Sequence, residues 1–323
     1  MFKNKSKMLL VAIFCMVAVC TSFLACSKNE GNANAGTSTG TESSFSSSNT
    51  SKKKVKKAKL PTKPNAEEDF IVTLTNDNEG AQVTGYLGNG GGVYIPATIQ
   101  GLPVKRVDME IPRTAGVTSL VVSDGCEYVR VFSDKDEYGE RTILEITNIS
   151  LPDTVETYNL RNTMITEFEV PANAKRVGRL PITLEKITFR GVPEGIYEGA
   201  LEGTQITNIE LPEGMKYIEN EAFINCEMLT SVILPNTITR IGEYKGDANV
   251  FANCIALKSI NLPVSLELIG VGSFMNCTNL KELVIPESLT SIRNIYIKAF
   301  KGCSNLPLAT QAKLKQLGYR DTF

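Results

Sequence analysis

Short alternations of hydrophobic and polar residues recur along the second half of the chain. Three of them read apolar, any residue, apolar, proline, and they end at Pro235, Pro263 and Pro286. Such an alternation is typical of a short strand with one buried face, and the proline ends its hydrogen-bonded ladder. A second apolar stretch follows each proline, which predicts that the chain returns along the other side of a coil.

A four-residue motif marks the same place in each block. It reads phenylalanine, any residue, asparagine or glycine, then cysteine. It occurs at residues 223–226, 251–254, 274–277 and 300–303. Cys254 and Cys277 are 23 residues apart, and so are Pro263 and Pro286. A unit of this length cannot bury its own apolar face, so neighbouring units must stack into a solenoid. The four phenylalanines should then form one buried spine.

The repeat extends upstream in a shorter form. Segments 160–171 and 201–212 align with each other, and Thr163 and Thr204 stand where the later blocks have cysteine. Between 111 and 144 the pattern fades, so we expect an irregular loop or a decayed turn over 125–141. Residues 243–250 are longer than the matching stretch of the next block, which predicts an insertion on a loop face of the solenoid.

These blocks share a longer consensus that points to a known family. The unit reads roughly Leu-x-x-Ile-x-Leu-Pro, then Leu-x-x-Ile-Gly, then Ala-Phe-x-x-Cys. Over about residues 70–320 it resembles the BspA-like leucine-rich repeats of bacterial surface proteins. The resemblance implies an α/β-type solenoid, mostly β, with a right-handed coil. Family members are associated with adhesion to host matrix proteins or to other bacteria, and the resemblance implies a similar binding role.

The repeat region divides into three parts. We expect an N-terminal β-hairpin cap at 66–110, repeats at 111–306 and a C-terminal cap at 307–323. Residues 308–317 have apolar positions at helical spacing and precede Gly318, which predicts a short helix with a glycine C-cap over the last open turn.

The first 25 residues predict export. Three lysines precede the apolar run 8–19, and small residues lead up to Cys26. This arrangement is typical of a lipoprotein signal peptide, with cleavage before Cys26 and lipid on its thiol. The chain would then be anchored to a membrane of the cell envelope, the outer membrane or the cell surface. An uncleaved transmembrane anchor is the alternative, because 8–25 is nearly long enough to span a bilayer.

Residues 26–65 predict a disordered tether between the lipid and the repeats. The segment is dominated by Ser, Thr, Asn, Gly and Lys, which bury too little apolar area to fold. The net charge of −1 divides into +3 for 1–26, +6 for 27–65 and −10 for 66–323. An acidic repeat domain is poorly suited to nucleic acid, so we expect none as a partner.

Cysteine and histidine usage limits the chemistry. The chain has 8 cysteines and 0 histidines, so the usual general base and the commonest transition-metal ligand are missing. The four repeat cysteines should be reduced and buried at a tight corner, because threonine replaces them upstream. Disulfides between stacked turns are the alternative. We expect no enzyme, no cofactor and no metal site.

Acidic residues leave two further alternatives. Glu167 and Glu169 lie on one face of a strand, as glycosidase carboxylates would, but solvated surface explains them equally well. Asp134, Asp136, Glu137 and Glu140 offer oxygen ligands for calcium, yet lack the glycine and the spacing of an EF-hand loop.

The outward positions of the strands predict where a partner binds. Solenoids present such positions as a long regular surface. We expect the contact to be centred on two neighbouring strands, with Tyr244 of the insertion at its margin. The candidate residues are Asn208, Glu210, Ser231, Ile233 and Tyr244. The partner would be an unknown extracellular protein or glycan. A structural envelope scaffold with no soluble ligand is the alternative function.

Overall fold

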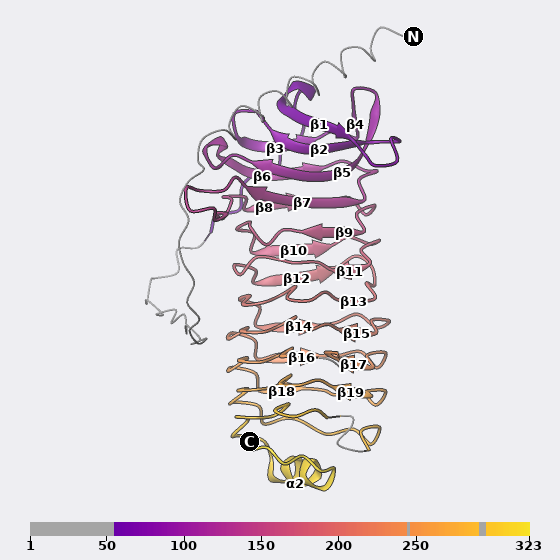
Figure 1. Ribbon diagram of the computed structural model, residues 1–323, viewed down its shortest axis with the longest axis vertical. Helices are drawn as coiled ribbons and strands as arrows, with labels where there is room; N and C mark the ends of the chain where they lie inside the picture. The colour runs from indigo at the N-terminus through magenta and orange to yellow at the C-terminus, as the bar shows by residue number, and fades with distance from the viewer. Residues whose placement is uncertain (1–54, 244–245, 291–294) are drawn as a thin grey trace, which may run out of the picture. The chain divides into compact units, whose positions relative to one another are not determined.

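The computed structural model describes residues 55–243, 246–290 and 295–323. They belong to one compact unit, residues 53–323. Each turn of the chain contributes a short strand to each of two columns, which Figure 1 shows side by side. Within each column the strands pair in parallel in groups of neighbouring turns, as expected for a solenoid of stacked turns.

The first column, which we call the first ladder, contains the strands that end near the prolines. Its members form three parallel groups, β3 with β6 and β8, β10 with β12, and β14 with β16 and β18. Their bounds are β3 Gly91–Ile95, β6 Val117–Val122, β8 Asn148–Ser150, β10 Glu167–Val170, β12 Lys186–Phe189, β14 Asn208–Glu210, β16 Ser231–Ile233 and β18 Ser259–Ile260.

The second ladder holds the returning strands. It runs from β2 through β5 and β7 to β9, and again from β11 through β13, β15 and β17 to β19. Their bounds are β2 Ala81–Tyr86, β5 Leu102–Ile111, β7 Tyr128–Ser133, β9 Thr157–Asn159, β11 Arg176–Val177, β13 Gly195–Ile196, β15 Tyr217–Ile218, β17 Arg240–Ile241 and β19 Leu268–Ile269.

The N-terminal end of the described chain departs from parallel pairing. A 3-10 turn, η1 (Glu67–Asp69), leads into β1 (Phe70–Leu74), which pairs antiparallel with β2. The two-residue strand β4 (Thr98–Ile99) pairs antiparallel with β5, and η2 (Arg113–Ala115) follows β5. The expectation that this region acts as a hairpin cap stays a prediction.

The phenylalanine spine is confirmed. Phe223, Phe251, Phe274 and Phe300 are fully buried. Successive ring centroids are 4.9, 5.3 and 5.2 Å apart, and the ring planes differ by 15°, 10° and 1°. These distances are close to the roughly 4.8 Å between paired strands, so each ring sits directly on the ring of the previous turn.

The cysteine ladder lies beside this spine and is reduced. The thiols of the four repeat cysteines are free and buried, and each donates to a main-chain carbonyl of the preceding turn. The pairs are Cys226 with Leu201 at 2.9 Å, Cys254 with Phe223 at 3.2 Å, Cys277 with Phe251 at 3.1 Å and Cys303 with Phe274 at 2.9 Å. The upstream Thr163 and Thr204 hydroxyls also donate to buried carbonyls, those of Leu160 and Leu201. A small donor at a tight corner is therefore the shared requirement.

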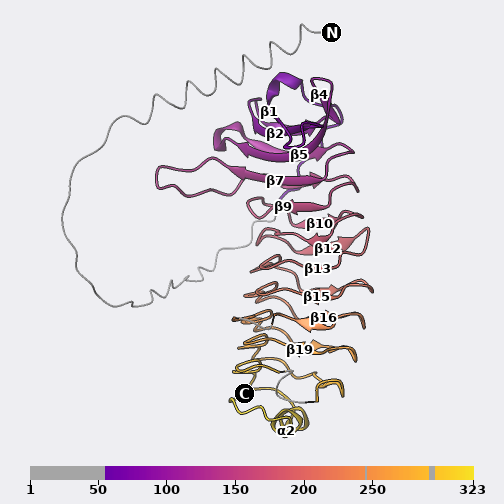
Figure 2. The ribbon, with the colours of Figure 1, turned by 45° about the vertical axis from the view of Figure 1, so that its right-hand side comes forward.

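The segment predicted as a loop or decayed turn is partly regular. Residues 128–133 form β7, which pairs in parallel with β5 and β9. The next residues form a projecting loop closed by a bridge between Lys135 and Arg141, and Figure 2 shows this loop standing out from the side. The strand is hidden in the sequence because its outward positions carry Tyr, Arg and Phe rather than the polar residues of the other strands.

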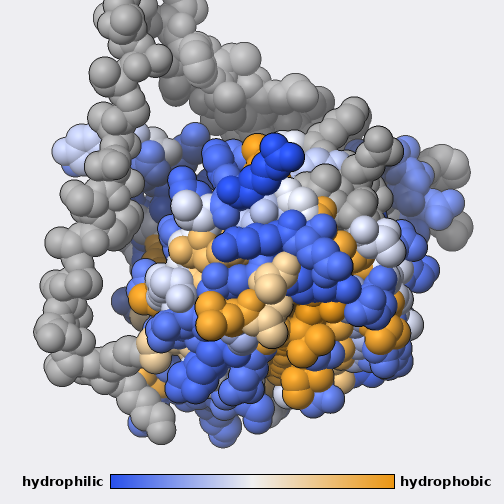
Figure 3. Space-filling view, turned by 90° about the horizontal axis from the view of Figure 1, so that it is seen from below, coloured by the Kyte–Doolittle hydropathy of each residue, from blue (hydrophilic) through white to orange (hydrophobic). Residues whose placement is uncertain are grey.

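A short helix near the C-terminus is confirmed. It is α2 (Leu308–Gln316), and Gly318 follows it with a left-handed φ of 100°. Thr310 and Leu314 are its buried residues. Beyond it, Tyr319 packs edge-on against Phe300 at 6.1 Å, and its hydroxyl accepts the Phe300 N–H at 2.9 Å. Seen from this end, hydrophilic residues cross the middle of the surface and hydrophobic residues lie beside them (Figure 3).

Candidate interaction faces of the solenoid

The outward side chains of the first ladder form what we call the first face. Asn208 pairs in register with Ser231, and Glu210 pairs with Ile233. The residues between them, Ile209 and Val232, point inward and are buried. Four of the five candidate residues therefore lie together on β14 and β16, as the alternation predicted. Their role in binding stays a prediction.

The polar groups of this face are held in place by one another. The Asn208 side-chain oxygen accepts the hydroxyls of Ser231 at 2.8 Å and Thr230 at 2.9 Å. Asn261, on the next turn, bonds the main chain of Leu234 through both its amide and its oxygen, at 2.8 and 2.7 Å. Pre-oriented donors and acceptors lose little entropy when a partner binds.

Two exposed apolar side chains stand among these polar ones. Ile233 is 51% exposed and Val284 is 80% exposed. Both occupy the second outward position of their strand segment, so they share one line along the first face. Their side chains offer a partner apolar area to bury within a polar surface.

A segment that we call the strap, residues 57–65, crosses the N-terminal part of the first face. Its Ala58 N–H donates to the Thr147 hydroxyl at 2.9 Å, and Asn148 donates its amide to the Ala58 carbonyl at 2.8 Å. Ser119 donates to the Lys59 carbonyl at 2.8 Å. These contacts fall within the region expected to be tether, and the domain boundaries of the chain stay predictions.

The strap also makes contacts at its two ends. Lys57 forms an ion pair with Glu167 of β10 at 3.3 Å. Asn65 and Tyr94 exchange hydrogen bonds, from the Asn65 N–H at 3.0 Å and from the Tyr94 N–H at 2.8 Å. Among the described residues the strap contacts thus run from β10 to β3. We call the remainder of the first face, the outward residues from Lys186 to Val284, the open half.

The insertion at 243–250 is only partly a surface loop. Ala248 and Val250 are fully buried, and Asp247 bridges to Val271. A methyl group placed on Gly242 or on Gly270 would lie 2.5 Å from the Ala248 side chain, so both glycines leave room for it. The insertion therefore contributes to the core through its second half. Tyr244, the fifth candidate residue, lies outside the described residues.

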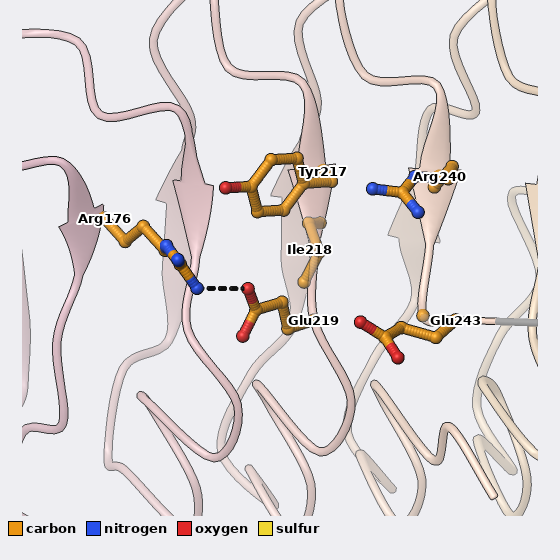
Figure 4. Close-up of a pocket in the computed structure, with 7 residues that line it drawn as sticks. Arg176, Tyr217, Ile218, Glu219, Arg240 and Glu243 are labelled. Atoms are coloured by element: carbon orange, nitrogen blue, oxygen red, sulfur yellow. Dashed lines mark hydrogen bonds and ion pairs between the residues drawn. The ribbon is translucent and has the colours of Figure 1, made fainter. Parts of the chain in front are cut away.

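The second ladder carries a surface that sequence reasoning missed, which we call the second face. Arg176, Gly195, Tyr217 and Arg240 occupy one register row across β11, β13, β15 and β17. A methyl group on Gly195 would lie 2.5 Å from the Tyr217 ring and its carbonyl, so the ring lies over the glycine. In Figure 4 the ring stands between the two arginines.

A shallow hollow of about 210 Å³ opens beside this row. Glu219 and Glu243 line it together with the arginines and Tyr217 (Figure 4). Arg176 donates to Glu219 at 2.8 Å, and the Glu198 N–H donates to the other Glu219 oxygen at 3.0 Å. Burial raises the pKa of the Tyr217 hydroxyl above its ordinary value.

Arginine and aromatic side chains recur along the whole second face. Arg106 lies 3.4 Å from the Tyr128 ring centroid, and Arg141 lies 4.1 Å from that of Phe132. Arg130 binds Asp108 through two hydrogen bonds, of 2.6 and 3.0 Å, and this bonding raises the arginine pKa. The signal in the sequence is an Arg or Tyr just before a buried residue of the returning strands β5, β7, β11, β15 and β17. Most of these charges are already paired within the second face, so their electrostatic requirements are met without a partner.

The acidic alternatives have structural explanations. Glu167 pairs with Lys57, and Glu169 pairs with Arg190 at 3.5 Å. Asp136 accepts the N–H groups of Tyr138 and Glu140, so its carboxylate shapes its own turn. Within the described ranges no group of three or more His, Cys, Asp or Glu is arranged to hold a metal ion.

The sequence profile of the "BspA type Leucine rich repeat region" matches residues 153–245 and 245–320, in six copies. These matches cover more than half of the chain. The chain belongs to the BspA-type leucine-rich repeat family. The family resemblance seen in the repeat consensus is therefore confirmed, and the family is one of solenoid proteins.

Solved structures of leucine-rich repeat proteins are also similar to this chain. One is a Treponema pallidum leucine-rich repeat protein, 23% identical, with 81% of this chain and 99% of that chain covered and a TM-score of 0.35. Another is a leucine-rich cell surface protein of Faecalibacterium prausnitzii, 18% identical, with 81% and 99% covered and a TM-score of 0.34. A third, from Bacteroides ovatus, is 16% identical, with 79% and 97% covered and a TM-score of 0.23. No curated protein matches the chain.

The membrane-related predictions fall largely outside what the structure describes. The signal peptide 1–25 and Cys26 lie in the residues that are not described. Across the described ranges, no helix combines the length and the hydropathy that crossing a bilayer requires.

Proposed function

We propose that this chain is a cell-surface-anchored, non-catalytic binding module that holds an extended extracellular protein or glycan on the open half of its first face. The observation that carries the proposal is the arrangement of β14 and β16. Their outward residues Asn208, Glu210, Ser231 and Ile233 form a rigid block in which polar groups surround an exposed apolar side chain. Such a block can supply both specificity and apolar burial.

The apolar residues favour binding over the scaffold alternative. What supports binding is the position of Ile233 and Val284 on one line of the most regular surface, where a single partner could cover both side chains. Burying one such side chain against a partner contributes about 1.5–3 kcal/mol.

The anchoring part of the proposal rests on the sequence. The charged start, the apolar run and the small residues before Cys26 support lipidation of that thiol, with membrane attachment as the result. The lipid would display the solenoid at the envelope surface, where an extracellular partner can reach it.

A pull-down with the purified chain tests the binding role. Immobilised protein is exposed to surface proteins and to glycans, and the retained material is compared with that held by Ile233→Glu. The matched control is Val264→Glu, because Val264 is 75% exposed but lies in the turn after β18 and is not one of the outward strand positions. We expect Ile233→Glu to lose the partner and Val264→Glu to keep it.

The insertion is tested by Tyr244→Ala. A deletion of the loop is unsuitable, because Ala248 packs in the core between Gly242 and Gly270. If Ile233→Glu and Tyr244→Ala both retain the partner at full strength, the site lies elsewhere. If no surface protein or glycan is retained by any of these proteins, the scaffold function is favoured.

A further inference from the structure

The strap shows how the first face binds a length of polypeptide. Its contacts follow the chain in order: Lys57 at β10, Ala58 at β8, Lys59 at β6 and Pro61 at β3. Pro61 packs on Gly92, since a methyl group on that glycine would lie 3.0 Å from the proline ring. The strap thus runs across the strands, along the axis of the solenoid.

The geometry requires the strap to be extended. Four strands in neighbouring turns span about 14 Å at roughly 4.8 Å per step. The four residue steps from 57 to 61 reach at most about 14 Å when fully stretched. The first face therefore binds an extended chain, with about four residues for every three turns of the solenoid.

The strap is recognised mainly through its main chain. Ser119 and Asn148 donate to carbonyl oxygens, and Thr147 accepts an N–H. These contacts do not depend on the side chains of the strap, so other extended sequences could make them. Within the described part of the chain the charged contact of the strap is the ion pair of Lys57 with Glu167, which adds a preference for lysine.

The same types of side chain continue beyond the strap. Gly92, Ser119 and Asn148 form one register row under it. In the open half the corresponding row contains Asn208, Ser231 and Ser259 in register, and Ser259 bridges to Glu282. Small hydrogen-bonding side chains thus recur at the same outward position on both sides of β10.

The charges of the open half suit a basic segment. Glu210 on β14 and Glu282, which bridges to Ser259 of β18, are exposed there. Lys186, at the edge next to the strap, would repel a lysine of the partner. The preferred lysine contacts therefore lie farther along the face, around Glu210. The repeat region as a whole carries a net charge of −10, which attracts cationic partners.

We propose that the open half binds an extended, lysine-containing polypeptide segment of a partner protein, laid across the strands as a continuation of the strap. The proposal rests on the proposed function and names the class of partner. The partner's carbonyl and N–H groups meet Asn208, Ser231 and Ser259, its lysine meets Glu210, and an apolar side chain covers Ile233.

A labelled synthetic peptide with the sequence of residues 55–65 serves as the probe, because it contains the strap and its four lysines. Its binding to the full-length chain is followed by fluorescence anisotropy. A second peptide carries glutamate in place of each lysine. The protein variants are Glu210→Lys on the open half and Glu227→Lys as a control, since Glu227 is exposed in a turn off the face and the change in charge is the same.

We expect saturable binding of the lysine peptide and none of the glutamate peptide. Glu210→Lys should weaken binding about fivefold or more, and Glu227→Lys should leave it within about twofold. Raising NaCl from about 0.05 to 0.5 M should also weaken it, because the Debye length shortens.

Three results would overturn the proposal. They are no saturable binding up to about 1 mM peptide, equal weakening by the two charge reversals, and retention of an acidic polysaccharide in place of the peptide. If the peptide fails while Ile233→Glu still loses a surface partner in the pull-down, only the partner class is wrong. If Ile233→Glu also has no effect in the pull-down, the proposed binding role of the open half is wrong as well.

Discussion

Asn253 donates its side-chain amide to the side-chain oxygen of Asn225 at 2.8 Å, and both residues have a left-handed backbone with φ of 61°. Asn276 continues the row by donating to Asn253 at 2.8 Å. Gly302 takes the same place in the last motif with φ of 81°. The corner therefore requires a residue that tolerates positive φ, which explains why the motif has asparagine or glycine before each cysteine.

Replacing Asn253 tests this explanation. Asn253→Gly keeps the backbone conformation but loses the amide bonds, whereas Asn253→Ala also forces an ordinary residue into left-handed backbone at about 1–2 kcal/mol. We expect the alanine variant to be less stable than the glycine variant by about that amount in urea denaturation. Equal stability of the two variants would show that the conformation of this corner is not decisive.

The phenylalanine spine should be costly to interrupt. Phe274→Ala leaves a cavity between two stacked rings, and the turns on either side prevent it from closing. We expect a loss of about 3–5 kcal/mol in the free energy of unfolding, measured by chemical denaturation. Ile255→Ala, at a position that is 43% exposed, is the control and should change stability by less than about 1 kcal/mol. A loss at Phe274 no larger than the control would contradict the spine's role.

Buried thiols should make the fold sensitive to alkali. Burial raises the pKa of Cys126 to about 12 from its ordinary 9.0, and it raises those of Cys254 and Cys277 as well. These three thiols ionise above pH 9 in the unfolded chain but stay protonated there in the folded chain. Stability is thus unaffected by Cys126 below pH 9 and falls as pH rises from 9 to about 12, by up to about 1.4 kcal/mol per pH unit for each thiol.

Urea denaturation between pH 8 and 11 measures this loss, and Cys126→Ala should reduce its slope. The buried hydroxyl of Tyr158, whose pKa burial also raises, adds to the loss at the upper end of the range. The native thiols should react with iodoacetamide far more slowly than those of the unfolded chain. A slope that is the same with and without Cys126 would show that this thiol titrates normally in the folded state.

The lipid anchor can be tested apart from the fold. Cys26→Ser removes the only sulfur that the signal motif offers for lipid, so the protein should leave the membrane fraction. The repeats should keep their thermal stability, since the structure builds its core from residues after 66. Mass spectrometry of the mature N-terminus decides the point, and an unmodified Cys26 or a retained segment 1–25 would exclude the lipoprotein.

The sequence was sufficient to predict the core because each core position recurs at a fixed interval. Phe223 and Phe251 occupy the same place in successive units, so their stacking follows from the repeat itself. The alternation around Ile209 and Val232 likewise predicted which neighbours face outward. Repetition converts a weak local signal into a strong one.

Features that occur once could not be predicted in this way. The strap lies in a polar, lysine-rich segment whose composition indicates disorder, and its partners Ser119 and Asn148 belong to the turns where the repeat is weakest. The row of Arg176, Tyr217 and Arg240 depends on the register between returning strands, which two-residue strands do not specify locally. The burial of Ala248 could not be predicted, because it depends on Gly242 and Gly270, which surround this side chain only in the fold.

The strap also determines how tension enters the molecule. A pull on the chain ahead of residue 55 reaches the solenoid first at the pair of Lys57 and Glu167, then at Ala58, then at Lys59. Because each contact belongs to a different turn, the bonds are loaded in sequence rather than together. The segment would peel away at low force and lengthen the connection, while the turns that hold the phenylalanine spine remain unloaded until the strap is gone.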